Sequence, residues 1–160
     1  VYNRSSLDIV ANGNNDGDNE TGSNIRLYGG IGEYAKNVYK DESGSKLSTD
    51  EDGYVIYEDN DKKILVNYTK NDKELVFPQG ITEIYENAFY SRNTITKVEI
   101  PDGVTTIGRN AFYGCAGLTE ITIPSSVTEI EDYAFRNCTG LTALEMPQSV
   151  TDIKKSVFNG

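Results

Sequence analysis

The sequence has no histidine and no tryptophan, and only two cysteines and one methionine among its 160 residues. Without histidine the chain cannot form a Ser-His-Asp or Cys-His nucleophile system. Two cysteines alone are too few for a zinc site made only of cysteine, which takes four. These absences argue against the common hydrolase and zinc-protein classes, so we expect a protein that is not an enzyme, with no metal site and no cofactor.

Positive charge is also scarce: 15 basic residues stand against 25 acidic ones, and the formal net charge is −10. Nucleic acids and anionic membranes both attract basic surfaces. No run approaches the ~20 apolar residues of a membrane span. We therefore expect neither a nucleic-acid partner nor membrane insertion. Because the chain opens with Val1 and not with methionine, we also expect a processed or excised piece of a longer protein.

An internal repeat begins at Pro78. Segments 78–100, 101–123 and 124–146 are each 23 residues long, and a fourth segment, 147–160, stops after 14 residues. They share the pattern P-x-x-V/I-T-x-I-x-x-x-A-F-x-x-C-x-x-L/I-T-x-I-x-I. A unit this short cannot bury its apolar side chains alone, so the copies must stack, with strands of successive coils ~4.8 Å apart.

Each part of the repeat predicts a local structure. The alternation that ends in Ile121-x-Ile123 predicts a short strand, which Pro124 must end because proline has no N–H. The apolar spacing from Ile130 to Leu141 predicts a helix of a turn or two. Stacking predicts two internal columns of equivalent residues, one of Ile100, Ile123 and Met146 and the other of Phe89, Phe112, Phe135 and Phe158.

The repeat resembles the BspA-like leucine-rich repeats of bacterial surface proteins. The resemblance rests on the Ala-Phe pairs at 88–89, 111–112 and 134–135, the cysteines at 115 and 138, the L-T-x-I-x-I runs and the P-x-x-V-T-x-I linkers. It covers 78–160 and departs from the pattern at Arg92, in a cysteine position, and at Val157, in an alanine position.

The resemblance implies an α/β solenoid, which is a short leucine-rich-repeat stack of 23-residue coils with parallel short strands and short helices. It also implies a secreted or cell-surface protein. We expect a non-catalytic, adhesin-like interaction module that binds a protein or glycan ligand. The alternatives are a structural spacer, or an accessory domain of a carbohydrate-active enzyme whose catalytic part lies outside this chain.

Residues 54–77 precede the repeats and have their own strand pattern. Two apolar stretches, 54–57 and 64–68, flank the polar residues 58–61 and predict a β-hairpin. Leu75-Val76-Phe77 then matches the strand that closes each later repeat. We expect 54–77 to form an N-terminal cap over the first coil, as members of the resembled family often have.

Residues 1–53 form a polar segment rich in Asn, Gly and Asp, in which the spacing after Gly30 predicts one short helix at about 31–40. The residues from Asn12 to Asp18 match the first positions of a calcium loop, but Ser23 stands where the bidentate acid is required. A solvated linker is therefore favoured over calcium binding.

Cys115 and Cys138 occupy equivalent positions in successive repeats. The favoured interpretation is two small buried side chains. A disulfide is the alternative, because stacked coils bring equivalent Cα atoms to roughly 5 Å.

The outward side chains of the repeat strands predict one continuous ligand face. The candidates are Lys97, Glu99, Glu120, Thr122 and Glu145. For any single residue, a plain polar sheet surface is the simpler interpretation. Glu99 and Glu145 would lie ~10 Å apart, a spacing loosely compatible with an inverting glycosidase pair, but a regular solenoid face offers no deep pocket.

The incomplete fourth repeat predicts an uncovered end. Phe158 and the strand expected at 144–146 would lack a covering coil, and exposed apolar edges promote pairing. We therefore expect self-association through the truncated C-terminal coil, or a frayed end.

Overall fold

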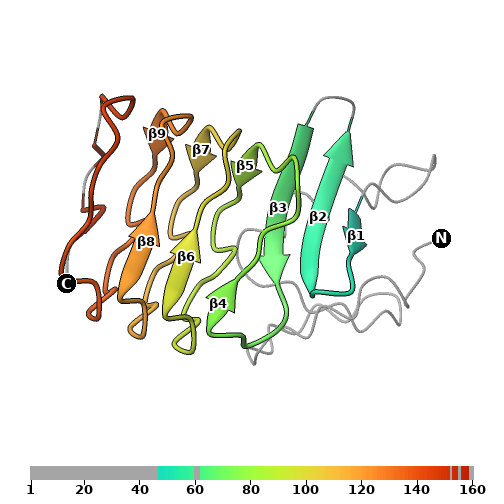
Figure 1. Cartoon of the computed structure of the whole chain (residues 1–160), viewed down its shortest axis with the longest axis horizontal. Coiled ribbons are helices and arrows are strands. Elements are labelled where there is room, and N and C mark those ends of the chain that lie inside the picture. Colours follow the sequence, from blue (N-terminus) through green and yellow to red (C-terminus); the bar gives the residue numbers. More distant parts are fainter. Residues whose placement is uncertain (1–46, 60–61, 152, 155, 159–160) are drawn as a thin grey trace, which may run out of the picture.

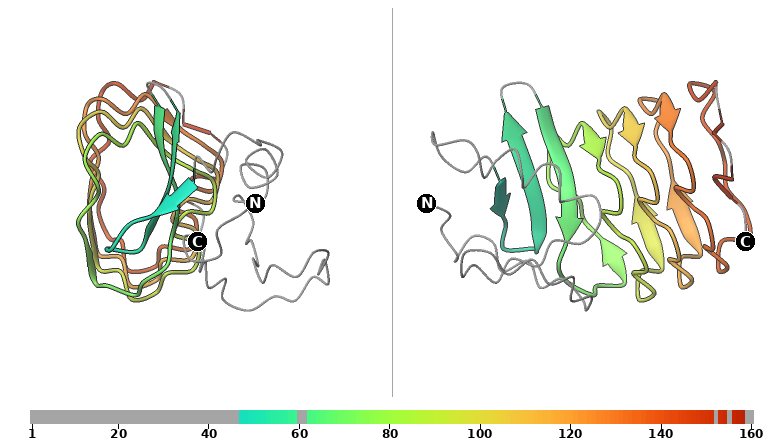
Figure 2. Two further views of the ribbon diagram at one scale, coloured as in Figure 1. Left: turned by 90° about the vertical axis from the view of Figure 1, so that its right-hand side faces the viewer. Right: turned by 180° about the vertical axis from the view of Figure 1, so that it is seen from behind.

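The computed structural model describes residues 47–59, 62–151, 153–154 and 156–158. The helix expected at 31–40 and the calcium-loop pattern at 12–23 lie outside these residues. The described chain winds into successive coils that stack along one axis (Figure 1). In the view along that axis, Figure 2 shows the coils as nested loops around a common interior.

The strands form two sheets on two sides of the coils. The larger sheet has the order β1-β2-β3-β5-β7-β9, and the smaller has the order β4-β6-β8. The strands are β1 (Leu47–Thr49), β2 (Tyr54–Asp59), β3 (Lys62–Tyr68), β4 (Glu74–Leu75), β5 (Glu83–Ile84), β6 (Lys97–Glu99), β7 (Thr106–Ile107), β8 (Glu120–Thr122) and β9 (Glu129–Ile130). From β3 to β9, neighbours within each sheet run parallel, as expected for stacked coils.

The first three strands pair antiparallel with one another. β2 pairs with β3 from Tyr54 opposite Tyr68 to Asp59 opposite Lys62, and β1 pairs with the other edge of β2. β1 lies in a polar stretch from which the sequence pattern predicted no strand. β3 then pairs in parallel with β5, so the coil stack continues the same sheet.

A column of aromatic side chains fills the interior. Phe89 stacks on Phe112 with ring centroids 4.9 Å apart, Phe112 on Phe135 at 5.5 Å, and Phe135 on Phe158 at 5.8 Å. The column extends into the hairpin, because Phe89 also contacts Tyr68 at 5.7 Å. The inner phenylalanines are at most 2% exposed, whereas Phe158 is 42% exposed at the end of the column.

The prediction of helices around the Ala-Phe pairs is wrong, because the described residues contain no helix. Consecutive turns replace them, closed by bonds such as the one from Cys138 N–H to Phe135 O. Asn87, Asn110 and Tyr133 have φ values of 58°, 54° and 62°, which a right-handed helix cannot include.

The hydrogen bonds of these turns explain why the apolar spacing was misleading. The N–H groups of Asn87, Phe89 and Ser91 donate to carbonyls of the next coil instead of to their own segment. Every second donor is therefore used between coils, and an i to i−4 ladder cannot form.

The strand expected at 144–146 is also absent, although Leu144 and Met146 are partly buried against the core. β8 is the last strand of its sheet. A strand at 144–146 would be the edge strand of this sheet and would pair with β8 on one side only. Such a strand forms about half of the backbone hydrogen bonds of an inner strand.

We predict that Phe112→Ala will lower the free energy of unfolding by about 3–5 kcal/mol, because the ring is fully buried between two others. Phe158→Ala removes the same side chain from the exposed end of the column and serves as the matched control. Chemical denaturation followed by circular dichroism measures both. Equal losses for the two variants would contradict the inferred dependence of each coil on its neighbours.

The self-association expected at the C-terminal end remains a prediction. Ile153 and Phe158 are 53% and 42% exposed there. Light scattering of the chain should show a concentration-dependent mass that falls when both residues are changed to serine. A monomer at all concentrations, with a rigid C-terminal end, would contradict the expectation.

Candidate functional site

The candidate face lies on the smaller sheet, where strand alternation divides buried from outward side chains. Val98 and Ile121 point into the core and are 0% and 8% exposed. Their neighbours in β6 and β8 point outward. Lys97 lies opposite Glu120, and Glu99 lies opposite Thr122. The structure therefore brings these predicted residues together on two adjacent strands.

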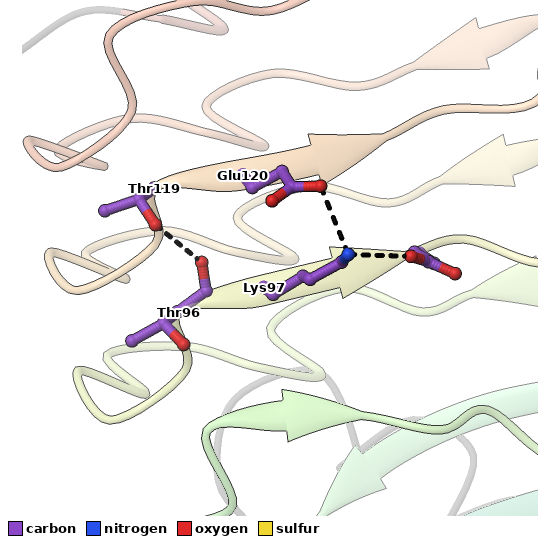
Figure 3. A network of polar contacts seen from close by, with 5 residues as sticks. Thr96, Lys97, Thr119 and Glu120 are labelled. Carbon is purple, nitrogen blue, oxygen red and sulfur yellow. Dashed lines mark hydrogen bonds and ion pairs between the residues drawn. The ribbon is translucent and has the colours of Figure 1, made fainter.

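An ion-pair network joins the two strands across this face (Figure 3). Lys97 Nζ lies 3.0 Å from Glu99 Oε1 and 3.3 Å from Glu120 Oε1. Hydrogen bonds to the two carboxylates raise the pKa of Lys97 above its ordinary value. The ammonium group is thus held between the strands in its charged form. Exposed pairs of this kind contribute little to stability, so the network organises the face more than it holds the fold.

A ladder of threonines fixes the start of the same strands. Thr119 Oγ1 donates to Thr96 O at 3.1 Å, as Figure 3 shows, and Thr96 Oγ1 donates to Lys73 O at 3.2 Å. Each hydroxyl bonds to the coil that precedes it. The spacing of β4, β6 and β8 is therefore set by side chains as well as by the backbone ladder.

Glu145 lies apart from the other candidates. Its side chain is exposed, but residues 144–146 form no strand, so it has no register partner in β8. At the other end of the face Val76 is 81% exposed, just beyond β4. The candidates that lie on paired strands are therefore those of β6 and β8. Val76 and Glu145 flank these strands.

The thiols of Cys115 and Cys138 are free and buried. They donate to Phe89 O and Phe112 O, each at 3.1 Å, so both bond to the coil that precedes them. Burial raises the pKa of Cys115 to about 12 and that of Cys138 to about 11. The structure agrees with two small core side chains and has no disulfide between them.

Two features of the repeats were missed by the sequence reasoning. Arg92, in a cysteine position, turns its guanidinium toward the hairpin and donates to Tyr68 O. Burial lowers its pKa. Tyr90 and Tyr113, in equivalent positions, stack with centroids 4.9 Å apart and planes within 1°. Their 23-residue spacing was the signal that could have revealed this pair.

Within the described ranges, no group of three or more acidic or cysteine side chains is arranged to hold a metal ion. The same ranges contain no helix with the length and apolarity of a transmembrane span.

Stacked coils whose short strands pair in parallel on two sides define a leucine-rich-repeat solenoid. A sequence model of the BspA type Leucine rich repeat region matches residues 65–160 in 6 copies. The chain belongs to this family. The match begins inside β3, upstream of Pro78, where the regular 23-residue segments start. The comparisons indicate no enzymatic family.

Solved structures of bacterial leucine-rich-repeat proteins are similar to this chain. The T. pallidum Leucine Rich Repeat protein is 28% identical with a TM-score of 0.62, over 67% of this chain and 53% of that protein. A leucine-rich repeat protein from Bacteroides capillosus is 26% identical with a TM-score of 0.59, over 69% of this chain and 88% of that protein.

A leucine rich cell surface protein from Faecalibacterium prausnitzii is also similar. It is 26% identical with a TM-score of 0.56, over 74% of this chain and 41% of that protein. The chain therefore spans about half or less of two of these three proteins. Comparison with the curated proteins gave no match.

We predict that a thiol reagent such as Ellman's reagent will modify Cys115 and Cys138 far more slowly in the native protein than after unfolding. The raised pKa values leave little reactive thiolate at about pH 8, and burial blocks access. Absorbance of the released product measures the rate. Equal rates in the native and unfolded states would show that the thiols are not core side chains.

Proposed function

We propose that this chain is a non-catalytic interaction module, secreted or displayed at the cell surface, that binds a protein or glycan ligand. The proposed ligand face consists of Lys97, Glu99, Glu120, Thr122 and Glu145. The observation that carries the proposal is the fixed array on β6 and β8, where one ammonium group is held between two carboxylates on an open face. Repeat strands present such arrays as extended binding surfaces.

The family supports this proposal at a general level. Leucine-rich repeats are typical of proteins that bind partners through a repeated surface, and the similar F. prausnitzii protein is described as a cell surface protein. The ligand face also suits a large partner better than a small molecule, because its side chains stand on the open surface of a sheet.

We propose that residues 54–77 serve as the N-terminal cap of the repeats in 78–160. β3 provides the sheet edge on which β5 pairs, and Tyr54 and Phe77 lie with ring centroids 6.0 Å apart beside the phenylalanine column. The hairpin thus covers both the backbone edge and the aromatic core of the first coil.

The alternatives are a structural spacer, in which the face has no ligand of its own, or an accessory domain of a carbohydrate-active enzyme whose catalytic part lies outside this chain. The ion pairs of Lys97 are satisfied within the face, which is also what a purely structural surface requires.

We predict that the double variant Glu99→Gln and Glu120→Gln will weaken ligand binding by about tenfold or more, because it removes both carboxylates while keeping side-chain shape. Immobilised chain would be probed with extracellular-matrix proteins and a glycan array. The matched control is Glu83→Gln with Glu129→Gln, which makes the same charge change on the larger sheet. Unchanged binding in the first variant would favour the spacer role for this face.

A further inference from the structure

The stacked tyrosines lie outside both the phenylalanine column and the proposed ligand face. Tyr90 and Tyr113 belong to the turns that lead from β5 to β6 and from β7 to β8. Tyr90 remains 46% exposed although Tyr113 lies parallel to one face of its ring. Exposed, rigid tyrosines offer a large contact area at a low cost in conformational entropy.

The two tyrosines differ in what the next coil offers their hydroxyls. Asn137 follows Tyr113 by one coil, and its Nδ2 donates to the Tyr113 hydroxyl at 3.1 Å. The equivalent residue after Tyr90 is Gly114, which has no side chain. Among the described residues, the Tyr90 hydroxyl has no hydrogen-bond partner. The Tyr113 hydroxyl therefore has an amide donor in the next coil, whereas the Tyr90 hydroxyl has none.

Gly114 lies beside the side chain of Ser91. A Cβ atom at Gly114 would lie 3.2 Å from Ser91 Oγ, so a second hydroxyl borders the position. Arg92 donates to Tyr68 O, and the Arg136 guanidinium lies 5.2 Å from the centre of the Tyr133 ring. Among the described residues, Arg136 Nε is buried without a hydrogen-bond partner.

We propose that Tyr90, Tyr113 and the Gly114 position form a binding site for a neutral saccharide. A hydroxyl or acetamido group of the sugar donates to the Tyr90 hydroxyl, as the Asn137 amide does to Tyr113 one coil later. Ser91 supplies a further hydrogen bond. The C–H groups of the sugar ring carry partial positive charge and contact the exposed part of the Tyr90 ring. Neutral hydroxyl-rich ligands match this site, because the side chains that border it offer the uncharged hydroxyls of Tyr90 and Ser91.

The variant Gly114→Asn tests the proposal directly. Gly114 has a φ of 70° and Asn137 a φ of 59°, and asparagine tolerates this conformation. Only the end of the Ser91 side chain stands in the way of the new Cβ. The variant should fold normally and provide the Tyr90 hydroxyl with its own amide, which blocks the sugar without removing either ring.

The probes are N-acetylchitohexaose, cellohexaose and an array of neutral glycans, with affinity measured by NMR titration up to about 10 mM saccharide. We expect binding to the wild-type chain, weakened about tenfold or more in both Gly114→Asn and Tyr90→Ala. Thermal melting checks that both variants fold. The variant Glu83→Gln with Glu129→Gln, on the larger sheet and outside the proposed ligand face, should keep wild-type saccharide affinity.

Three results would overturn the proposal. They are the absence of binding by every neutral glycan, saccharide binding that both site variants leave unchanged, and a site that binds only peptides and loses them in Gly114→Asn. Because none of these results depends on the sheet face, failure here leaves the proposed function intact.

Discussion

The stacking of each coil on its neighbour is the interaction on which the remaining structure depends. In the part of the chain that the structure describes, no coil has a helix or a strand ladder of its own, because alternate turn N–H groups and the threonine hydroxyls bond to adjacent coils. Thr105 and Thr119 each donate to the threonine 23 residues earlier, one at each sheet. The 23-residue separation of both bonds equals the repeat length, so equivalent residues of successive coils lie side by side at both sheets.

This constraint leaves the outward side chains free to vary. Buried positions must match from coil to coil, as Phe89 and Phe112 do. Lys97 faces Glu120 across the strands without any such requirement, because exposed ion pairs contribute at most about 1 kcal/mol. The charges on β6 and β8 are thus not needed for folding.

Much of the coil could be predicted from the sequence, because period and apolar pattern determine which side chains face inward. The outward pairing of Lys97 with Glu120 followed from that period alone. Whether the Ala-Phe segments form helices could not be predicted from the apolar spacing. The same spacing fits both a helical turn and a turn with positive φ, such as the one at Asn110. The choice depends on hydrogen bonds between coils, which no single segment reveals. The ion pairs of Lys97 depend on rotamers, which the sequence also leaves open.

Departures from the repeat are the most informative positions in such a chain. Arg92 interrupts the cysteine column but keeps its role, since its guanidinium donates to Tyr68 O in the hairpin where Cys115 Sγ donates to Phe89 O in the preceding coil. The first coil therefore keeps its donor to the preceding backbone despite the substitution. Gly114 stands where the next coil has Asn137, at a φ of 70° that glycine adopts freely. The exposed hydroxyl of Tyr90 therefore has no amide beside it. The two departures differ because a buried donor position must be filled by a protein group, whereas an exposed hydroxyl can bond to water.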